Sequence, residues 1–511
     1  MPEGTAYPSA HGTAVSQPML IRGGYIADVA ARRVVRADVL VEGGRVRSVI
    51  PPGGDGTAAQ VIDASGCLVI PGLINAHSHS YSPLVRHVAQ GLPLEPWMMY
   101  CWANTIGRTP EETYLSATLQ GIEALKTGTT TVLDHLGGDV EVMSAALRAY
   151  FDLGIRAVLA PMVSDISMPD TVGVPSAQWP PDTRADDDAL APADAAELLG
   201  MSEVLHADWH GRDDRLSVFL GPSGPQRCSI AMLEQVADLA SKLDTGVHTH
   251  LLETRVQART PTPRDERSWV RVLDSVGLLT SRLSVAHAVW LSEQDMHDLA
   301  GRGVSIVHNP QSNLQLGSGI GQLHRWRRHG IPVALGTDGV NCGGSMDMLN
   351  SMRLAAIIHR PGLANPLGWE SPWSVLDSAT RGGANALSMR DLGSIAPGMR
   401  ADLSVFETTG TAFATHEDSL ASLVLSSYDH RARMVMVGGR IVVDDGQVTT
   451  VDERGAVEQA AQMHYAMTRR NSRYADLAQA QEGFLTQLSL AAAPAREIVS
   501  FEMPQEWEPS A

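Results

Sequence analysis

Pro71-Gly72-Leu73-Ile74-Asn75-Ala76-His77-Ser78-His79 is the stretch that decides the fold, because an apolar segment of β type ends there in a His-x-His pattern. Residues i and i+2 of a strand point to the same side, so His77 and His79 can address one ion while Ser78 turns away. Neutral imidazole is a ligand of both zinc and iron. A lone His-x-His pattern is a weak signal, so the rest of the chain must decide whether this pair binds a metal.

Strand-like and helix-length segments alternate from this stretch onward, which predicts a parallel α/β architecture. The strand-like segments cover residues 73–76, 130–134, 156–161, 216–221, 246–250, 283–287, 304–308 and 331–336. Eight such strands are the number that closes a (β/α)8 TIM barrel. We therefore predict an α/β fold with a (β/α)8 barrel at residues 71–394.

Polar side chains fall at the ends of these predicted strands, where a (β/α)8 barrel carries its catalytic groups. They are His77, His79, Asp134, His135, Ser223, His248, His250, His287, His308 and Asp338. This distribution strengthens the interpretation of the His-x-His pair as part of a metal site.

Both flanks of the predicted barrel have a different texture, with short β-like pieces separated by glycine pairs. Residues 19–70 and 395–450 therefore predict one small β-sandwich domain built from both chain ends. Residues 1–18 are polar and rich in Pro, Ser and Gly, which predicts a flexible N-terminus. Residues 451–511 predict a C-terminal helical extension, helical up to about residue 493.

One acidic, proline-containing segment, from about residue 165 to 215, is too long for an ordinary connection after the third barrel strand. It is either a substrate lid or a disordered insertion, and the functional role of loops on that face of a barrel favours a lid.

The composition indicates a globular enzyme, with 44% hydrophobic and 19% charged residues among 511. A formal net charge of -18 argues against nucleic acid or an anionic membrane as partner and favours small molecules. The four cysteines, Cys67, Cys101, Cys228 and Cys342, are widely spread and form no Cys-x-x-Cys pair. They are typical of reduced thiols, and no targeting or bilayer-spanning segment stands out, so we expect a cytoplasmic protein.

The order of these motifs along the chain resembles the amidohydrolase superfamily, and within it the mononuclear branch of cytosine, adenosylhomocysteine and guanine deaminases and triazine hydrolases. The resemblance covers about residues 19–450. It includes 71–79, 92–97, Lys126-Thr127-Gly128-Thr129-Thr130-Thr131, His248-Thr249-His250-Leu251-Leu252-Glu253-Thr254, 286–287, 308–313, Leu335-Gly336-Thr337-Asp338-Gly339 and 397–403.

The resemblance implies one divalent metal ion, held by His77, His79, His250 and Asp338 with a water in the open position. Zinc is the first expectation, and iron suits the same ligands. Such an ion is a Lewis acid that lowers the pKa of the water from about 15.7 towards roughly 7.

The resemblance also implies the roles of Glu253, His287 and Asp338 as catalytic residues. Glu253 would protonate a ring nitrogen while metal-bound hydroxide attacks the adjacent carbon, and His287 and Asp338 would handle the protons of the water and of the leaving amine. Trp97, Gln226, His248 and His308 are candidates for substrate binding, with a role for His248 in bracing the site as the alternative.

The positions of the lysines bear on the number of metal ions in the site. Binuclear members of the superfamily bridge their metals through a carboxylated lysine, or less often a glutamate, at the end of the fourth strand. This chain has only Lys126 and Lys242, and both precede strands. The end of the fourth strand, residues 218–222, carries no lysine or acid, which predicts a mononuclear site and favours deamination over cyclic amide hydrolysis.

The chain departs from the adenosine-type deaminases of this branch after the fourth strand. They commonly have Gly-Pro-His-Ser-Pro-Tyr-Thr-Cys-Ser, where this chain has Gly221-Pro222-Ser223-Gly224-Pro225-Gln226-Arg227-Cys228-Ser229. The missing histidine and tyrosine put a nucleoside substrate in doubt and leave the metal chemistry untouched.

The predicted function is therefore a metal-dependent hydrolytic deaminase of a nitrogen heterocycle, with a small heterocyclic molecule as its partner and homo-oligomerisation implied by the family. Three alternatives stay open. One is displacement of chloride or an alkylamine from a triazine-like ring, and another is cyclic amide hydrolysis. The third, a catalytically silent scaffold, predicts missing ligands, and none is missing.

Overall fold

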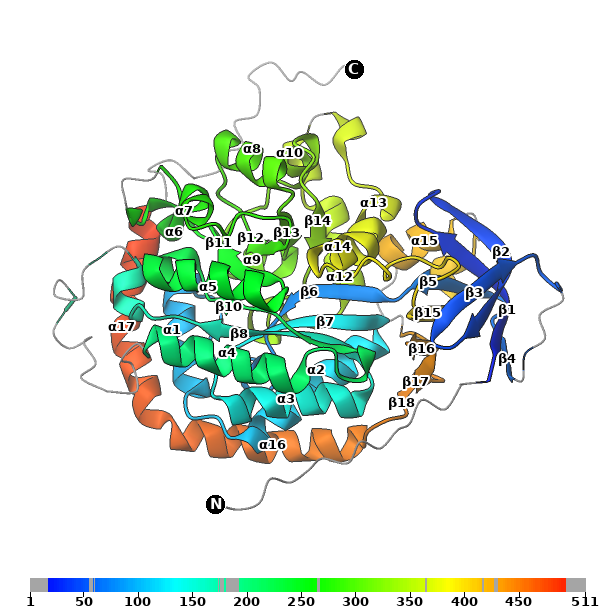
Figure 1. The fold of residues 1–511 in the computed structure, drawn as a ribbon, viewed down its shortest axis with the longest axis horizontal. Coiled ribbons are helices and arrows are strands. Elements are labelled where there is room, and N and C mark those ends of the chain that lie inside the picture. The colour runs from blue at the N-terminus through cyan, green and yellow to red at the C-terminus, as the bar shows by residue number, and fades with distance from the viewer. Residues whose placement is uncertain are drawn as a thin grey trace, which may run out of the picture.

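A central barrel and a flanking sheet make up the computed structural model of the protein (Figure 1), with helices wrapped around the barrel. The structure describes residues 17–54, 58, 60–172, 174, 179–180, 193–263, 267–363, 365–415, 418–426 and 431–492. The flexible N-terminus expected at residues 1–18 lies almost entirely outside these ranges, as does the end of the chain beyond residue 492.

All eight predicted barrel strands are present. They are β6 (Leu73–Ser78), β7 (Thr129–Leu136), β8 (Arg156–Val163), β9 with β10 (Leu216–Val218, Gly221–Pro222), β11 (Val247–Leu251), β12 (Leu283–His287), β13 (Ser305–His308) and β14 (Val333–Leu335). The fourth predicted strand is thus divided into two short pieces. The order of elements agrees with the predicted α/β barrel.

Parallel pairing runs through these strands in two groups, β6 to β10 and β11 to β14. A parallel bridge between Leu220 and Val247 joins the two groups on one side. On the other side the backbone N–H of Asp338, just after β14, donates to the carbonyl of His77 in β6 at 3.0 Å. This second junction brings the last strand, with its carboxylate, beside the His-x-His strand.

Helices follow the barrel strands and cover the outside of the barrel (Figure 1). The longer ones are α1 (Leu94–Thr105), α2 (Pro110–Lys126), α3 (Val140–Leu153), α4 (Ala195–Trp209), α5 (Ile230–Leu243), α8 (Glu293–Arg302) and α12 (Met348–Ile357). The shorter ones are α6 (Arg255–Arg259), α7 (Trp269–Ser275), α9 (Pro310–Gln315), α10 (Leu323–Arg328), α11 (Val340–Gly343), α13 (Pro372–Asp377), α14 (Gly383–Ala386) and α15 (Ser419–Ala421).

Local sequence sets several of these helix ends. Thr109 and Glu112 form a capping box at the start of α2, where each side chain accepts the other residue's backbone N–H. Gly154 ends α3 with φ 76°, a left-handed conformation that favours glycine. These signals hold α2 and α3 in register against the first barrel strands.

The segment expected to be a lid contains an ordinary barrel helix. Helix α4 occupies residues 195–209 and covers the third strand, so the connection is shorter than its 50 residues suggest. Residues 164, 166, 167 and 171 at the start of the segment line the cavity described below. Residues 181–192, the most acidic part, lie outside the described ranges.

Both chain ends meet in one nine-stranded mixed sheet at the right of Figure 1. Its strands are β1 (Met19–Asp28), β2 (Arg33–Glu42), β3 (Arg45–Ile50), β4 (Gln60–Asp63), β5 (Cys67–Pro71), β15 (Leu403–Glu407), β16 (Met434–Val437), β17 (Arg440–Asp444) and β18 (Gln447–Val448). Strand β15 pairs antiparallel with β5, which joins the two ends of the chain.

A buried ion pair fastens this sheet to the barrel. The guanidinium of Arg156, at the start of β8, donates to both carboxylate oxygens of Asp402, next to β15, at 3.0 and 3.2 Å. Both side chains are almost fully buried, so removing either partner would leave an uncompensated charge.

Two long helices, α16 (Glu453–Arg470) and α17 (Ser472–Ala492), form the expected C-terminal extension. Helix α16 contacts α2, where Lys126 pairs with Glu453 at 2.6 Å. Helix α17 packs along α1 with an apolar core that includes Met99, Ala103, Ala478 and Leu485. In the part of the chain that the structure covers, no helix is both long and apolar enough to cross a bilayer.

Candidate active site

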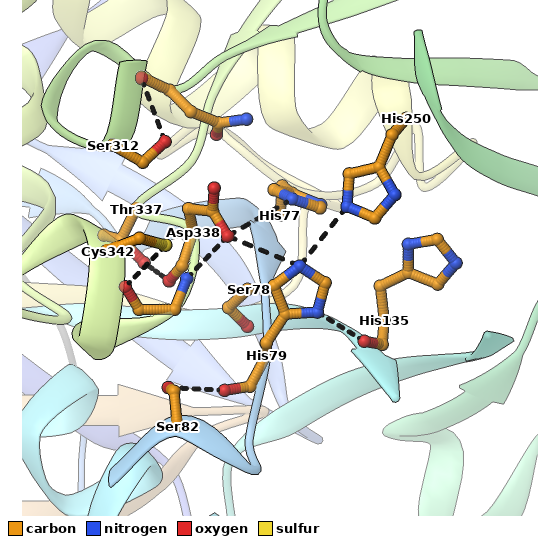
Figure 2. A network of polar contacts seen from close by, with 12 residues as sticks. His77, Ser78, His79, Ser82, His135, His250, Ser312, Thr337, Asp338 and Cys342 are labelled. Carbon is orange, nitrogen blue, oxygen red and sulfur yellow. Dashed lines mark hydrogen bonds and ion pairs between the residues drawn. The ribbon is translucent and has the colours of Figure 1, made fainter. Parts of the chain in front are cut away.

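Four candidate ligands converge at the carboxyl ends of three barrel strands (Figure 2). His77 and His79 come from β6, His250 from β11, and Asp338 follows β14. The Nε2 atom of His79 lies 3.3 Å from both Asp338 Oδ1 and His250 Nε2, and His77 Nε2 lies 3.7 Å from Asp338 Oδ1. The four side chains predicted to bind the metal therefore lie close together.

This spacing fits a bound divalent cation. Around an ion with bonds of about 2.0–2.1 Å, neighbouring tetrahedral ligand atoms lie roughly 3.3 Å apart. His77 Nε2 is buried, has no hydrogen-bond partner and faces the other ligand atoms. Its orphaned lone pair is accounted for by a metal, since a buried polar atom without any partner is otherwise unfavourable.

The far nitrogen of each imidazole is held by the protein. His79 Nδ1 donates to the carbonyl of His135 at 2.5 Å, and His250 Nδ1 donates to the carbonyl of Ser223 at 2.6 Å. These bonds leave each Nε2 with its lone pair directed at the common centre, which is the form that binds a metal.

His77 is held through a relay of two further residues. Its Nδ1 lies 2.8 Å from His248 Nε2, and His248 Nδ1 lies 2.8 Å from the hydroxyl of Ser284. When His77 Nε2 is the atom that binds a metal, His77 Nδ1–H donates to His248 Nε2, and His248 Nδ1–H donates to the Ser284 hydroxyl. His248 therefore lies behind a ligand and braces it, the alternative role considered above.

The surroundings of His77, His250 and Asp338 favour the protonation states that bind a metal. Burial lowers the pKa of His77 and of His250 well below the usual range, so both imidazoles are neutral. Burial raises the pKa of Asp338, but the imidazoles of His79 and His287 outweigh it and keep that pKa below its usual range. Neutral imidazoles and an ionised carboxylate are the forms that bind a divalent cation.

The three predicted catalytic residues lie together beside this centre. His287 Nε2 is 3.7 Å from Glu253 Oε2 and 3.7 Å from Asp338 Oδ2, while Asp338 Oδ1 faces the histidine ligands. His287 Nδ1 donates to Asn313 Oδ1 at 2.8 Å, which leaves Nε2 as the atom that exchanges protons. His287 and Asp338 have φ of 70° and 63°, strained values that are common at functional sites.

Glu253 lies in a dry environment that favours its neutral form. Burial raises the pKa of its carboxyl group above the usual range, and the Ser318 hydroxyl, which donates to Oε1 at 3.0 Å, partly opposes this. A carboxylic acid with a raised pKa keeps its proton to higher pH, which suits it to act as a general acid.

A cavity of about 590 Å³ opens from this centre toward the surface. Glu253, His287, Asp338, His79 and His250 line its inner end. Its size is within the range of cavities that take small organic ligands. The wall beyond the polar residues includes apolar side chains of α1, among them Leu94, Trp97, Met98 and Met99.

Of the four residues predicted to bind substrate, the structure brings only Trp97 to the cavity wall. His248 uses both ring nitrogens on protein groups. Gln226 and His308 are buried and are not among the lining residues, and the His308 ring lies 5.5 Å from that of Trp326. These three residues lie outside the cavity lining, and a contact between them and the substrate stays a prediction.

Sequence reasoning missed several residues of the site. Asn313 and Ser318 position His287 and Glu253, and Arg108 and Arg227 line the cavity. Asn313 belongs to the quoted 308–313 motif without a role assigned to it, and Arg227 stands at a position where the chain departs from its branch. A charged residue in the turn that follows a barrel strand was the available signal for Arg227.

The geometry agrees with what comparisons with known proteins show. The model of the amidohydrolase family matches residues 68–442, most of the chain, and the protein belongs to this family. The 5'-deoxyadenosine deaminase of Methanothermobacter thermautotrophicus is 32% identical over 447 residues, 87% of this chain and 97% of the relative. The 5-methylthioadenosine/S-adenosylhomocysteine deaminase of Thermococcus kodakarensis is 33% identical over 426 residues, 83% and 94% of the two chains.

Solved structures also resemble this fold. An adenosine deaminase from Xanthomonas campestris with bound zinc has a TM-score of 0.79 at 28% identity, covering 88% of this chain and 98% of the other. The atrazine chlorohydrolase of Arthrobacter aurescens complexed with zinc has a TM-score of 0.80 at 26% identity, covering 87% and 100%. These findings confirm the family resemblance and the barrel.

Proposed function

We propose that this protein is a metal-dependent hydrolytic deaminase that removes an amino group from a carbon of a nitrogen heterocycle. The observation that carries the proposal is the placement of Glu253 and Asp338, each with a carboxylate oxygen 3.7 Å from His287 Nε2, beside three converging imidazoles. Relatives named for the deamination of adenine nucleosides support the reaction class and make aminopurines the first substrates to test.

His77, His79, His250 and Asp338 would hold one divalent cation. We propose zinc, which two similar solved structures contain, while iron suits the same ligands. When bound, the cation supplies Lewis acidity that makes a water nucleophilic near neutral pH. A single ion is consistent with a strand-four end, Gly221–Pro222, that offers no lysine or acid.

The side chains then divide the proton transfers among them. Water adds its oxygen to the ring carbon, and Glu253 gives its proton to the adjacent ring nitrogen, which takes up the electron pair of the C=N bond. His287 and Asp338 accept the proton that the water loses. His287 then returns it to the amino group, the C–N bond breaks, and ammonia leaves the ring. The hydroxyl on the ring carbon becomes a carbonyl as it gives its remaining proton to Glu253, which restores the acid.

The first experiment is to measure ammonia release and metal content on one purified sample, across aminopurines, aminopyrimidines, aminotriazines and their chlorinated analogues. We expect about one metal ion per chain and ammonia from at least one amine. Glu253→Gln should keep the metal and lower kcat by about 10²- to 10⁴-fold, the usual contribution of a general acid. Glu458→Gln, on the exposed face of α16, is the matched control and should change nothing.

Displacement of chloride is a second candidate, because the zinc-containing atrazine chlorohydrolase has a similar fold. Attack on an electron-poor ring carbon is common to both reactions. Metal without ammonia from any amine, together with chloride release from a chlorinated analogue, would establish this second reaction. A purified protein that binds no metal would contradict both.

Four free, buried cysteines agree with a reducing compartment, and we propose a cytoplasmic location. A homo-oligomeric state stays a prediction from the family, to be checked by measuring the mass of the protein in solution.

A further inference from the structure

Two arginines line the cavity outside the metal centre. Arg227 belongs to the single turn Pro225–Arg227 that follows β10, and Arg108 follows α1. Neither residue has a place in the proposed reaction. Arg227 also occupies one of the positions at which this chain departs from the adenosine-type deaminases.

Arg227 has only neutral partners. Its Nη1 donates to the Ser223 hydroxyl at 3.2 Å, its Nη2 lies 2.7 Å from the sulfur of Met98, and its buried Nε has no hydrogen-bond partner. Burial lowers the pKa of Arg227, but an arginine side chain keeps its proton in proteins. A full positive charge therefore stands at the cavity wall.

Arg108 has the same character. It donates to the backbone carbonyls of Thr105 and Gly137, lies 5.5 Å over the ring of Tyr81, and its buried Nε has no partner. Across the residues that the structure describes, no carboxylate lies within ion-pair distance of Arg108 or Arg227. The carboxyl groups of Glu253 and Glu95 partly oppose the effect of burial on the pKa of Arg227 without forming an ion pair with it, and Glu95 accepts hydrogen bonds from Thr254 and Ser489.

Elsewhere this fold neutralises its buried arginines. Arg156 pairs with Asp402 at 3.0 Å, and Arg215 pairs with Asp213 at 2.6 Å. Arg108 and Arg227 are partly buried, and a partly desolvated charge with no counter-charge in ion-pair distance is unfavourable, so two such groups on one cavity wall need an explanation. An anion that enters with the ligand supplies the missing counter-charge.

We propose that the substrate carries an anionic oxygen group, a carboxylate or a phosphate, on a substituent of its heterocycle, and that Arg227 binds this group with Arg108 adding positive potential. Each Nη group of Arg227 makes one printed contact and carries a second N–H, so the two Nη groups together can donate to such an anion, as arginine commonly does with carboxylate and phosphate. The cavity of about 590 Å³ has room for a ring and a charged substituent.

This inference rests on the proposed deaminase function only for the identity of the ring. Binding can therefore be tested apart from turnover, by calorimetry on metal-loaded protein in a Glu253→Gln background. Three matched pairs serve as probes: adenosine 5'-monophosphate with adenosine, S-adenosylhomocysteine with 5'-methylthioadenosine, and benzoate with benzamide. The first pair tests phosphate, and the other two test carboxylate.

We expect the anionic member of at least one pair to bind about 10-fold or more tightly than the neutral member, as hydrogen bonds to a charged group allow. Arg227→Gln should remove this preference and leave binding of the neutral member unchanged, and Arg227→Lys should restore part of it. Arg454→Gln, an exposed arginine of α16 that pairs only with Glu458, is the control and should behave as the parent.

Equal behaviour of both members in every pair, whether both bind or neither does, would overturn the inference. An equal loss for charged and neutral ligands in Arg227→Gln would also overturn it, because Arg227 would then serve the ring or the fold. Ammonia release without any preference for charge would contradict this inference alone. A clear preference for charge in a protein that releases no ammonia would contradict only the proposed function.

Discussion

At the inner end of the cavity the polar side chains hold one another, whereas at the arginine end two guanidinium groups face the cavity with neutral partners only. His79 and His250 are each fixed by a backbone carbonyl, and His77 is fixed by His248. Arg227, by contrast, contacts the hydroxyl of Ser223 and the thioether of Met98. The first set is complete apart from a cation, and the second lacks an anion.

This difference separates the reaction from the choice of substrate. The inner groups sit at the ends of barrel strands, which are rigid and far apart in sequence, so their geometry changes little when loops change. Arg227 sits on a short turn after β10 and Arg108 on the segment between α1 and α2. Loops of this kind can be altered without disturbing the barrel, so a change there can alter specificity and leave the reaction intact.

The strongest way to test this separation is to remove the acidic ligand. Asp338→Asn keeps the shape of the side chain and loses its charge, so metal content should fall well below one per chain. Activity should fall on every substrate, by more than the 10²- to 10⁴-fold expected for Glu253→Gln. Metal analysis with a substrate panel measures both. A variant that loses activity on one substrate and keeps it on another would show that the reaction and the choice of substrate are not separable.

A smaller effect is expected behind the metal centre, at His248. His248→Phe fills the same space but leaves Nδ1 of His77 without its acceptor. Loss of such a support typically weakens metal binding by about 10- to 100-fold. Metal titration against a competing chelator measures this change, and kcat at saturating metal should stay near that of the parent. If instead the preference between charged and neutral ligands changed, His248 would take part in substrate binding.

The smallest effect should come from Ser318, as a shift in pH dependence. Glu253 must be protonated to act as an acid, so activity falls as the pH rises through its raised pKa. The Ser318 hydroxyl favours the ionised form, and Ser318→Ala should raise that pKa further. The alkaline limb of the kcat/KM profile should therefore move to higher pH. An unchanged limb, or a move to lower pH, would remove Glu253 as the titrating acid.

Periodicity made the barrel readable from the sequence, since each of its strands is a short apolar run that ends in a polar residue. The division of the fourth strand into β9 and β10 was not readable, because Phe219 and Leu220 between them continue the apolar run. Helix α4 was not readable either. It begins after an Asp194 cap inside an acidic segment, and only part of its length is free of charged residues.

Of the four candidate metal ligands, His77 and His79 were indicated by the two-residue period of a strand, whereas His250 and Asp338 were implied by the family resemblance. Gln226, His248 and His308 belong to neighbouring strands or turns, but they are not among the residues that line the cavity. A strand period says which side a residue faces, but it does not say how deep in the barrel the residue lies. His248 shares its side with His250 and is one layer further in, where its nitrogens meet His77 and Ser284.

The Glu95 carboxylate accepts hydrogen bonds from Thr254, beside Glu253, and from Ser489 of α17. These contacts affect the order in which the site can form while the protein is being synthesised. Ser489 is among the last described residues, and β15 to β18 complete a sheet that β1 begins. A chain emerging from the ribosome therefore makes its metal ligands long before it makes the helix that buries the neighbourhood of Glu253. Helix α17 follows the barrel in the sequence, so the whole barrel is synthesised before this helix can cover the site.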